Sequence, residues 1–213
     1  MADHKCEILV VDDHALFRRG LKEVLSGCSD IGRIDEAGSG TEAVEKVRKR
    51  RYDCVLLDIF MPGESGIEVI QRLKEVHAGV QCLVLSMYPM EQYGVRAIEA
   101  GAAGYLTKNV APDILKQAVG RICAGRKYID ALLAEKLAQK VQGVGGSPHD
   151  QLSNRELQVA VLIASGKSVS QIAQELFLSV KTVSSHRANI LRKIGLNNTS
   201  ELIQYAIKNG LIE

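Results

Sequence analysis

Short apolar runs alternate with amphipathic stretches up to about residue 125. The runs at 8–11, 54–57 and 82–85 are continuously apolar, as expected of strands that are buried on both faces of a parallel sheet. Five such strands alternating with five helices predict a doubly wound α/β domain with a five-stranded parallel sheet. The expected strands are 8–11, 33–37, 54–57, 82–85 and 104–106, and the expected helices are 15–26, 40–51, 66–77, 90–100 and 112–124.

The pattern changes after residue 125. Residues 129–141 have helical spacing with Asp130 as a candidate N-cap, and the Gly-rich stretch 143–148 is the clearest linker in the chain. From residue 151 the strand signals stop, and tight breaks divide the rest into four expected helices. We therefore expect a doubly wound domain at 1–125, a linker with one helix (about 129–141) at 126–150, and a small all-α four-helix domain at 151–213.

Composition is that of an ordinary globular protein, with 46% hydrophobic and 24% charged residues in 213. No apolar run approaches the ~20 residues that span a bilayer, and the first residues show no secretory signal. We expect a cytoplasmic location and no membrane partner. The cysteines are scattered without a C-x-x-C pair, which favours buried thiols over disulfides or metal ligands. They are Cys6, Cys28, Cys54, Cys82 and Cys123.

Charge changes this picture only slightly. The formal net charge is +2, and residues 150–213 hold seven Lys/Arg and five Asp/Glu, which accounts for the whole excess. Such a small excess permits nucleic-acid binding by the second domain but does not indicate it.

Polar side chains stand where the strands of the predicted sheet end. Ligands of open parallel sheets collect at this edge, and here it would carry three carboxylates, a hydroxyl and an ammonium. Three neighbouring carboxylates repel one another, and a hard cation such as Mg²⁺ offsets the repulsion. Each residue alone is typical of a turn, a helix cap or the surface, but their shared position favours a site. They are Asp12, Asp13, Asp58, Ser86 and Lys108.

Asp58 is the candidate nucleophile, because it ends the most central and most apolar strand. A carboxylate can form an acyl phosphate when a cation neutralises the incoming phosphoryl oxygens. We expect Asp13 to bind Mg²⁺ directly and Asp12 directly or through water. Asp58 and the backbone carbonyl of Phe60 would complete the metal ligands. The groups expected at the phosphoryl oxygens are Lys108 and Ser86.

Helix-start signatures organise the second domain. Ser153 and Ser168 each have a glutamate or glutamine three positions later, as in a capping box, and Ser179 is a third candidate cap. About four residues separate the helices that Ser168 and Ser179 begin, which is the spacing of a helix-turn-helix. We expect this motif at residues 168–187.

The expected helix 180–194 has two faces. Its apolar stripe should face the core, while the other face carries small side chains between basic ones, which suits close approach to DNA phosphates. A solvated amphipathic helix looks similar, but the preceding helix and turn favour DNA. Arg187 lies on the core side, where an ion pair with Glu156 is expected. Expected phosphate contacts are Lys181, Thr182, His186, Arg192 and Lys193, and expected base contacts are Ser184, Ser185, Ala188 and Asn189.

Three segments resemble the signatures of receiver domains: LVVDD at 9–13, DIFMPGESG at 58–66 and GAAGYLTK at 101–108. This resemblance implies a flavodoxin-like fold in which Asp58 accepts a phosphoryl group from a sensor histidine kinase or a small acyl phosphate. It also implies that Ser86 and Tyr105 form a switch pair: the hydroxyl moves to the phosphoryl group and the aromatic ring rotates inward.

Residues 172–190 resemble the LuxR-type helix-turn-helix, so that the whole chain is similar to two-component response regulators of the NarL/FixJ class. The resemblance implies a transcription regulator and not an enzyme, with double-stranded DNA as its partner and a homodimer on phosphorylation. In that class the last helix, here about 200–209, commonly pairs two DNA-binding domains. Its possible contacts are Leu202, Ile203 and Tyr205.

Two other functions deserve comparison. Haloacid-dehalogenase-like phosphatases also use an aspartate nucleophile and Mg²⁺, but they need a second acid where this chain has Phe60. A regulator that binds DNA without phosphorylation is disfavoured by the intact acidic pair, Asp58 and Lys108. Bulky Phe60 and Tyr88 stand two residues past Asp58 and Ser86, where polar residues could position a hydrolytic water, so we expect slow self-dephosphorylation.

Overall fold

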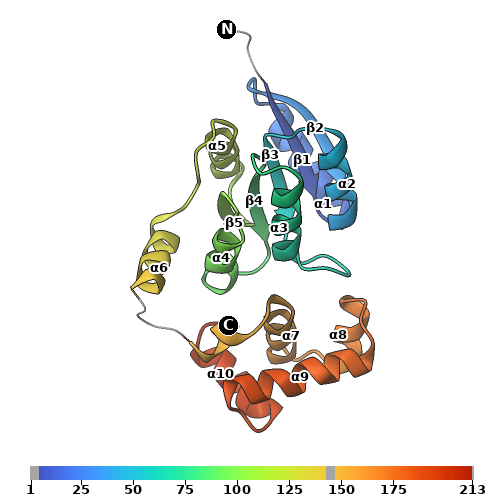
Figure 1. Ribbon diagram of the computed structural model, residues 1–213, viewed down its shortest axis with the longest axis vertical. Helices are drawn as coiled ribbons and strands as arrows, with labels where there is room; N and C mark the ends of the chain where they lie inside the picture. Colours follow the sequence, from blue (N-terminus) through green and yellow to red (C-terminus); the bar gives the residue numbers. More distant parts are fainter. Residues whose placement is uncertain (1–4, 143–146, 213) are drawn as a thin grey trace. The chain divides into compact units, whose positions relative to one another are not determined.

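A computed structural model describes residues 5–142 and 147–212 of the chain. The chain divides between Ala134 and Glu135 into two compact units. The first is an α/β unit and the second is helical, as the sequence pattern predicts (Figure 1). The helix that begins at Ala131 starts in the first unit and continues into the second.

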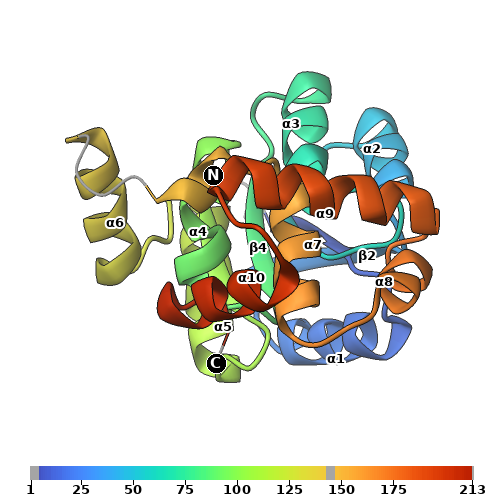
Figure 2. The same ribbon diagram turned by 90° about the horizontal axis from the view of Figure 1, so that it is seen from below.

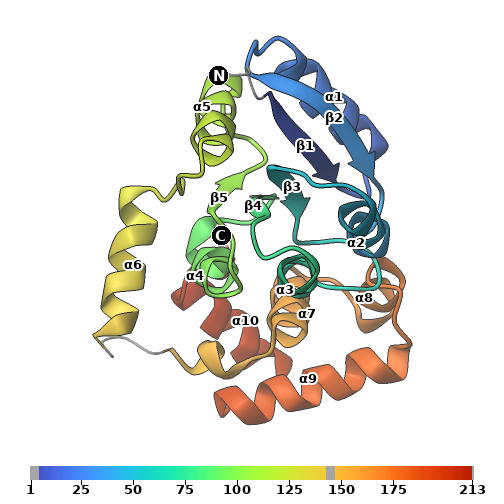
Figure 3. The ribbon, with the colours of Figure 1, turned by 45° about the horizontal axis from the view of Figure 1, so that its top comes forward.

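The first unit is a five-stranded parallel sheet in the order β2-β1-β3-β4-β5, which confirms the doubly wound fold. The strand arrows run the same way in Figure 3. Helices α1 and α5 pack on one face of the sheet, and α2, α3 and α4 cover the other (Figure 1). The elements are β1 Cys6–Val11, α1 Ala15–Ser26, β2 Ile31–Ala37, α2 Gly40–Lys49, β3 Cys54–Asp58, α3 Gly66–Val76, β4 Gln81–Ser86, α4 Met90–Glu99, β5 Gly104–Thr107 and α5 Pro112–Cys123.

The central strands are buried on both sides, as their continuous apolar pattern predicts. Every residue of β3 is buried, and β1 and β4 each have a single partly exposed position. Strand β2 lies at the sheet edge and is correspondingly less buried. It begins at Ile31, two residues earlier than expected, because its pairing with β1 extends back to Cys6.

The expectation that all cysteines are free thiols is wrong for one pair. The structure joins Cys6 to Cys123 by a disulfide across a Cα–Cα distance of 5.7 Å, within the range that disulfides span. The start of β1 and the end of α5 pack against the same core cluster. Because the two cysteines are 117 residues apart in the sequence, the local pattern could not indicate that they are neighbours. Cys28, Cys54 and Cys82 are free, and the last two are buried as expected.

Gly66 is required by a close backbone contact behind β3. A Cβ atom there would lie 2.3 Å from the carbonyl oxygen of Asp58 and 2.4 Å from the Cα of Ile59. Neither backbone atom can move without displacing Asp58, so we expect Gly66→Ala to lower the free energy of unfolding by at least about 2 kcal/mol.

The matched control is Gly120→Ala in α5, where nothing lies within 4 Å of the added Cβ. Because alanine favours helix more than glycine does, this variant should gain up to about 1 kcal/mol. Urea unfolding measures both changes. Equal stabilities of the two variants would contradict the assignment of the contact at Gly66.

Among the described residues, the second unit contains the end of α6, a short 3₁₀ helix η1 and the helices α7 to α10, and α8 lies near one end of the long α9 (Figure 2). The side chains of Ser153, Ser168 and Ser179 accept hydrogen bonds from backbone N–H groups at the starts of α7, α8 and α9, which confirms the three predicted caps. The elements are α6 Ala131–Val141, η1 Pro148–Gln151, α7 Asn154–Ala164, α8 Val169–Glu175, α9 Val180–Ile194 and α10 Thr199–Lys208.

The predicted linker is described only in part. Residues 143–146 lie outside the described residues, and Pro148, which the sequence pattern placed in the linker, is the first residue of η1. The available signal was the capping box of Ser147 and Asp150 with a proline at the first helical position. The helix expected at 129–141 begins at Ala131, and Asp130 accepts a hydrogen bond of 2.8 Å from the backbone N–H of Leu133, as a cap should.

Candidate functional site

Three carboxylates converge at the carboxyl edge of the sheet. Asp12 and Asp13 follow β1, and Asp58 is the last residue of the adjacent β3. The strand order reverses at β1, the position where open α/β sheets bind their ligands. One ligand atom from each of these residues and from His14 lies within 4.8 Å of the others. The structure thus brings the predicted acidic residues together.

Lys108 connects the acidic cluster to the end of β5. Its Nζ lies 2.6 Å from a carboxylate oxygen of Asp12 and 2.6 Å from one of Asp58. Burial alone would lower the pKa of Lys108, but the charges and hydrogen bonds of Asp58 and Asp12 outweigh it and raise that pKa. Lys108 is therefore a fixed cation between two buried carboxylates and not a solvated surface lysine.

Asp58 is 4% exposed, and burial raises its pKa to about 6, although Lys108 opposes the rise. Its Oδ1 accepts a hydrogen bond of 3.0 Å from the backbone N–H of Phe60, and Lys108 holds the other oxygen. Both oxygens of the carboxylate are thereby oriented. The expected role of the Phe60 carbonyl oxygen as a metal ligand stays a prediction.

Ser86 ends β4 beside Asp58 and is fully buried. Its Oγ accepts a hydrogen bond of 3.1 Å from the N–H of Tyr88, and its carbonyl accepts one of 2.7 Å from the N–H of Lys108. Tyr105, on the neighbouring strand, is 3% exposed and donates its hydroxyl hydrogen to the carbonyl of Tyr88 at 2.9 Å. The ring already lies inward in this structure, and its rotation stays a prediction.

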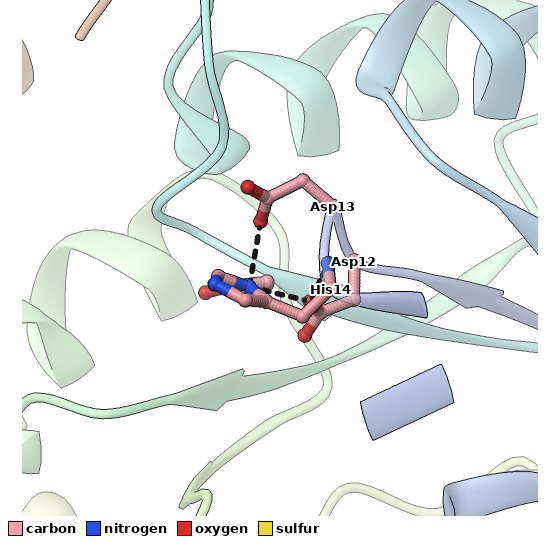
Figure 4. A group of neighbouring side chains, drawn as sticks. Asp12, Asp13 and His14 are labelled. Atoms are coloured by element: carbon pink, nitrogen blue, oxygen red, sulfur yellow. Dashed lines mark hydrogen bonds and ion pairs between the residues drawn. The ribbon is translucent and has the colours of Figure 1, made fainter. Parts of the chain in front are cut away.

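The donor set fits a hard divalent cation. Oδ1 of Asp13 is buried and receives no hydrogen bond, although it lies 3.0 Å from Nδ1 of His14. Figure 4 shows the carboxylates of Asp12 and Asp13 directed toward the His14 ring. A buried, unsatisfied carboxylate oxygen is unfavourable unless a cation or water reaches it. Carboxylate oxygens are also the ligands that Mg²⁺ prefers.

Two neighbours of the site were not predicted from the sequence. His14 comes directly after the acidic pair, which was the available signal, and its backbone N–H donates to Asp12 at 2.8 Å. Nζ of Lys108 lies over the face of the Phe17 ring, 4.6 Å from the ring centroid. Both residues line an apolar cavity of about 650 Å³ that extends from Lys108 along α1, with Leu16 and Met87 exposed at it.

Aromatic rings pack around Phe60, two residues past Asp58. The rings of Phe60 and Tyr88 stack with centroids 4.2 Å apart, and Tyr93 of α4 packs edge-on against Phe60 at 5.1 Å. Tyr93 is buried, and its hydroxyl has no hydrogen-bond partner, so it acts in this state as an apolar ring. The position of Phe60 and Tyr88 over a phosphoryl group on Asp58 stays a prediction.

The second candidate site is α9. Val183, Ile190 and Ile194 are its buried residues, which confirms the predicted core stripe. The residues expected at DNA are exposed or partly exposed along the rest of the helix, and Ser179 caps it through the N–H of Thr182 at 3.0 Å. They are Lys181, Thr182, Ser184, Ser185, His186, Ala188, Asn189, Arg192 and Lys193.

The predicted ion pair between Arg187 and Glu156 is wrong. Glu156 of α7 is 5% exposed, and it pairs with Lys193 at 2.7 Å, while Nε of Arg187 is buried without a hydrogen-bond partner. Lys193, six residues further along α9, reaches the start of α7 and also donates to the carbonyl of Gln151 at 3.4 Å. Among the expected phosphate contacts, Lys193 therefore already has a carboxylate partner.

The pair makes the stability of the second unit depend on pH. Burial alone would raise the pKa of Glu156, but hydrogen bonds from Lys193 and from Ser153 lower it below 4.5. A carboxyl whose pKa is lowered on folding stabilises the folded state above its unfolded pKa and loses this contribution as the pH falls. We therefore expect Glu156→Gln to destabilise the chain at pH 6 and to have little effect at pH 3 in urea unfolding.

Glu201→Gln is the matched control, because Glu201 occupies the same N-terminal position in α10 and accepts hydrogen bonds from the amides of Asn197 and Asn198. An equal loss of stability at both pH values in Glu156→Gln would contradict the role given to the Lys193 pair.

Known proteins resemble the chain over both units. Residues 8–120 match the model of the response regulator receiver domain, and residues 150–206 match that of bacterial regulatory proteins of the luxR family. The response regulator GacA of Pseudomonas viridiflava is 35% identical over 97% of both chains. The oxygen regulatory protein NreC of Staphylococcus carnosus is also 35% identical, over 97% of this chain and 99% of its own.

Two solved structures extend the comparison. The response regulator ChrA of a heme-sensing two-component system is 32% identical, with a TM-score of 0.52 over 98% of this chain and all of its own. RcsB of Salmonella enterica serovar Typhimurium, bound to a promoter in the presence of phosphomimetic BeF₃⁻, shares the fold at 24% identity, with a TM-score of 0.65 over 94% of this chain and 98% of its own. Within the described residues no helix is long and apolar enough to cross a membrane.

Proposed function

The chain belongs to the two-component response regulators of the NarL/FixJ class, in which a receiver domain is joined to a LuxR-type DNA-binding domain, and on this basis we propose that phosphorylation of Asp58 controls its binding to DNA. The observation that carries the proposal is that both carboxylate oxygens of Asp58 are hydrogen-bonded: one accepts from Nζ of Lys108 and the other from the backbone N–H of Phe60. We assign the receiver to 1–125, the linker to 126–150 and the DNA-binding domain to 151–213.

The proposed reaction transfers a phosphoryl group from a histidine of the sensor kinase to Asp58. An oxygen of Asp58 forms a bond to phosphorus, while the bond between phosphorus and the imidazole nitrogen breaks and its electron pair stays on that nitrogen. The opposite charges of Lys108 and the carboxylates orient the nucleophile before the donor arrives. Ser86 and Lys108 then hold oxygens of the acyl phosphate, and Tyr105 fills the space beside Ser86.

Asp12, Asp13 and Asp58 would hold Mg²⁺, with the carbonyl of Phe60 as a further ligand, and the ion supplies charge neutralisation for the phosphoryl oxygens. The proposal predicts that the purified chain incorporates one phosphoryl group from acetyl phosphate in Mg²⁺, and none in excess EDTA. Intact-mass measurement tests this. Equal incorporation with and without EDTA would exclude the metal site.

The kinase and a second copy of the chain are the proposed protein partners, with the chain in the cytoplasm. The apolar cavity along α1 includes Lys108 in its lining, so a helix docked there would bring a phosphohistidine close to Asp58. The dimer would form on phosphorylation, and Leu202, Ile203 and Tyr205 of α10 would lie in the contact between the two DNA-binding domains. A dimer suits paired half-sites about one or two helical turns apart on double-stranded DNA.

We expect the acyl phosphate to be long-lived. The rings of Phe60 and Tyr88 pack together with centroids 4.2 Å apart, and we propose that they exclude a polar group that could orient a hydrolytic water. Phe60→Asn should therefore shorten the lifetime, and Phe60→Leu, which stays apolar, should not. The decay of the phosphorylated species in Mg²⁺, followed by intact mass, measures it. A wild-type lifetime of seconds would contradict the expectation.

A further inference from the structure

The segment after α5 is attached to the receiver by more than its covalent continuity. Tyr128 forms a parallel bridge with Gly104 of β5, and its N–H donates to the carbonyl of Ala103 at 2.8 Å. Strand β5 is the last strand of the sheet, so Tyr128 pairs with its otherwise open edge. The Arg121 guanidinium lies 5.9 Å from the centre of the Tyr128 ring. The chain is thus tied to β5 before α6 begins.

A second attachment lies on α4. Leu133, in the first turn of α6, is 1% exposed, whereas its neighbour Leu132 is 45% exposed. Leu133 packs over Gly94, because a Cβ added to Gly94 would lie 3.0 Å from Cδ1 of Leu133. The missing side chain of Gly94 makes the seat into which Leu133 fits. Asp130 caps the same turn through the N–H of Leu133 and fixes its orientation.

Both attachment points adjoin residues of the proposed switch. Gly104 precedes Tyr105, whose hydroxyl reaches the carbonyl of Tyr88 above Ser86. Gly94 follows Tyr93, which packs against the rings of Phe60 and Tyr88 beside Asp58. If β5 or α4 moves when Asp58 is phosphorylated, the segment Tyr128–Leu133 therefore moves with it.

We infer that Tyr128–Leu133, called here the anchor segment, transmits the phosphorylation state of the receiver to α6. Helix α6 starts in the first unit at the anchor segment and continues into the second unit past Ala134. A helix propagates a change at its first turn along its axis, because each turn is hydrogen-bonded to the next. Anchoring that turn on α4 and β5 links the state of the receiver to the start of α6.

The inference rests on the proposed function, and its test separates the two. Wild type, Leu133→Ala and the control Leu132→Ala are compared with and without acetyl phosphate and Mg²⁺. The probe is a labelled duplex selected from a random pool by the phosphorylated wild-type chain. We expect all three chains to be phosphorylated at the same rate. In wild type and Leu132→Ala, phosphorylation should change the affinity for the duplex by roughly 5- to 150-fold.

In Leu133→Ala that ratio should fall to near one, because the helix start no longer follows α4. A wild-type ratio in Leu133→Ala would overturn the inference and leave the proposed function standing. A ratio near one in wild type itself would overturn both. Should Leu133→Ala impair phosphorylation, Gly94→Ala decides the question, since it fills the seat while retaining Leu133. An unchanged ratio in that variant would equally overturn the inference.

Hydrogen exchange supplies an independent readout. Phosphorylation should change the exchange rates of the amides in the first turn of α6 in wild type and in Leu132→Ala. Leu133→Ala should show no such change, although it carries the phosphoryl group. Exchange in this turn that responds equally in all three chains would contradict the role of Leu133.

Discussion

Asp58→Asn should take up no phosphoryl group from acetyl phosphate, whereas the wild-type chain takes up one. An amide has the shape of the carboxylate but is not a nucleophile at this pH. Lys108 keeps its contact of 2.6 Å with Asp12, so the substitution leaves the ammonium paired. The Phe60 N–H can still donate to the side-chain oxygen. The loss should therefore concern chemistry and not folding.

Asp113→Asn is the matched control, because the Asp113 side chain is 97% exposed at the start of α5 and its ion pair is with Lys116, which is not part of the acidic site. It should be phosphorylated like wild type. Intact mass gives the stoichiometry, and the thermal unfolding midpoint confirms the fold of each variant. Incorporation of a phosphoryl group into Asp58→Asn at the wild-type level would exclude Asp58 as the acceptor. A loss of phosphorylation in Asp113→Asn would show that the assay responds to general damage of the fold.

Removing the two exposed cations at opposite ends of α9 should weaken DNA binding strongly. Lys181 and Arg192 are exposed, whereas the neighbouring Lys193 is already paired with Glu156. Each lost phosphate contact lowers the slope of log affinity against log salt by about one. The double variant Lys181→Ala/Arg192→Ala should therefore lose roughly one to two orders of magnitude in affinity at about 0.1 M salt.

Lys208→Ala removes one positive charge from α10 of the same unit, outside α9, and its salt slope should match wild type. Titrations of a labelled duplex at several salt concentrations measure all slopes. An unchanged slope in the double variant would contradict the assignment of α9 to the phosphate backbone. A slope that falls equally in Lys208→Ala would show a general charge effect.

Local signals in the sequence were sufficient for the strands and α-helices of the described residues and for the acidic site, but the short η1 was not predicted. The strands β1, β3 and β4 are buried on both faces and hence continuously apolar, and the serine caps of α7, α8 and α9 depend on residues three positions apart. Once the strands were placed, Asp12, Asp13, Asp58 and Lys108 had to meet, because parallel strands end at one edge.

Contacts between distant elements could not be predicted in the same way. The choice of Lys193 over Arg187 as the partner of Glu156 depends on how α9 crosses α7, which helical periodicity does not specify. The disulfide between Cys6 and Cys123 depends on α5 returning to the start of β1. The seat of Leu133 on Gly94 was equally hidden, since a glycine inside a helix indicates a close contact without naming its partner.

The central claim, that phosphorylation at Asp58 switches DNA binding, is tested most directly by footprinting the chain on genomic DNA with and without acetyl phosphate, using Asp58→Ala as the control. We expect acetyl phosphate to create or extend protected sites for the wild-type chain at concentrations where the untreated chain protects little. Asp58→Ala should give the untreated pattern in both conditions. Protection by Asp58→Ala equal to that of the phosphorylated wild type would contradict the claim.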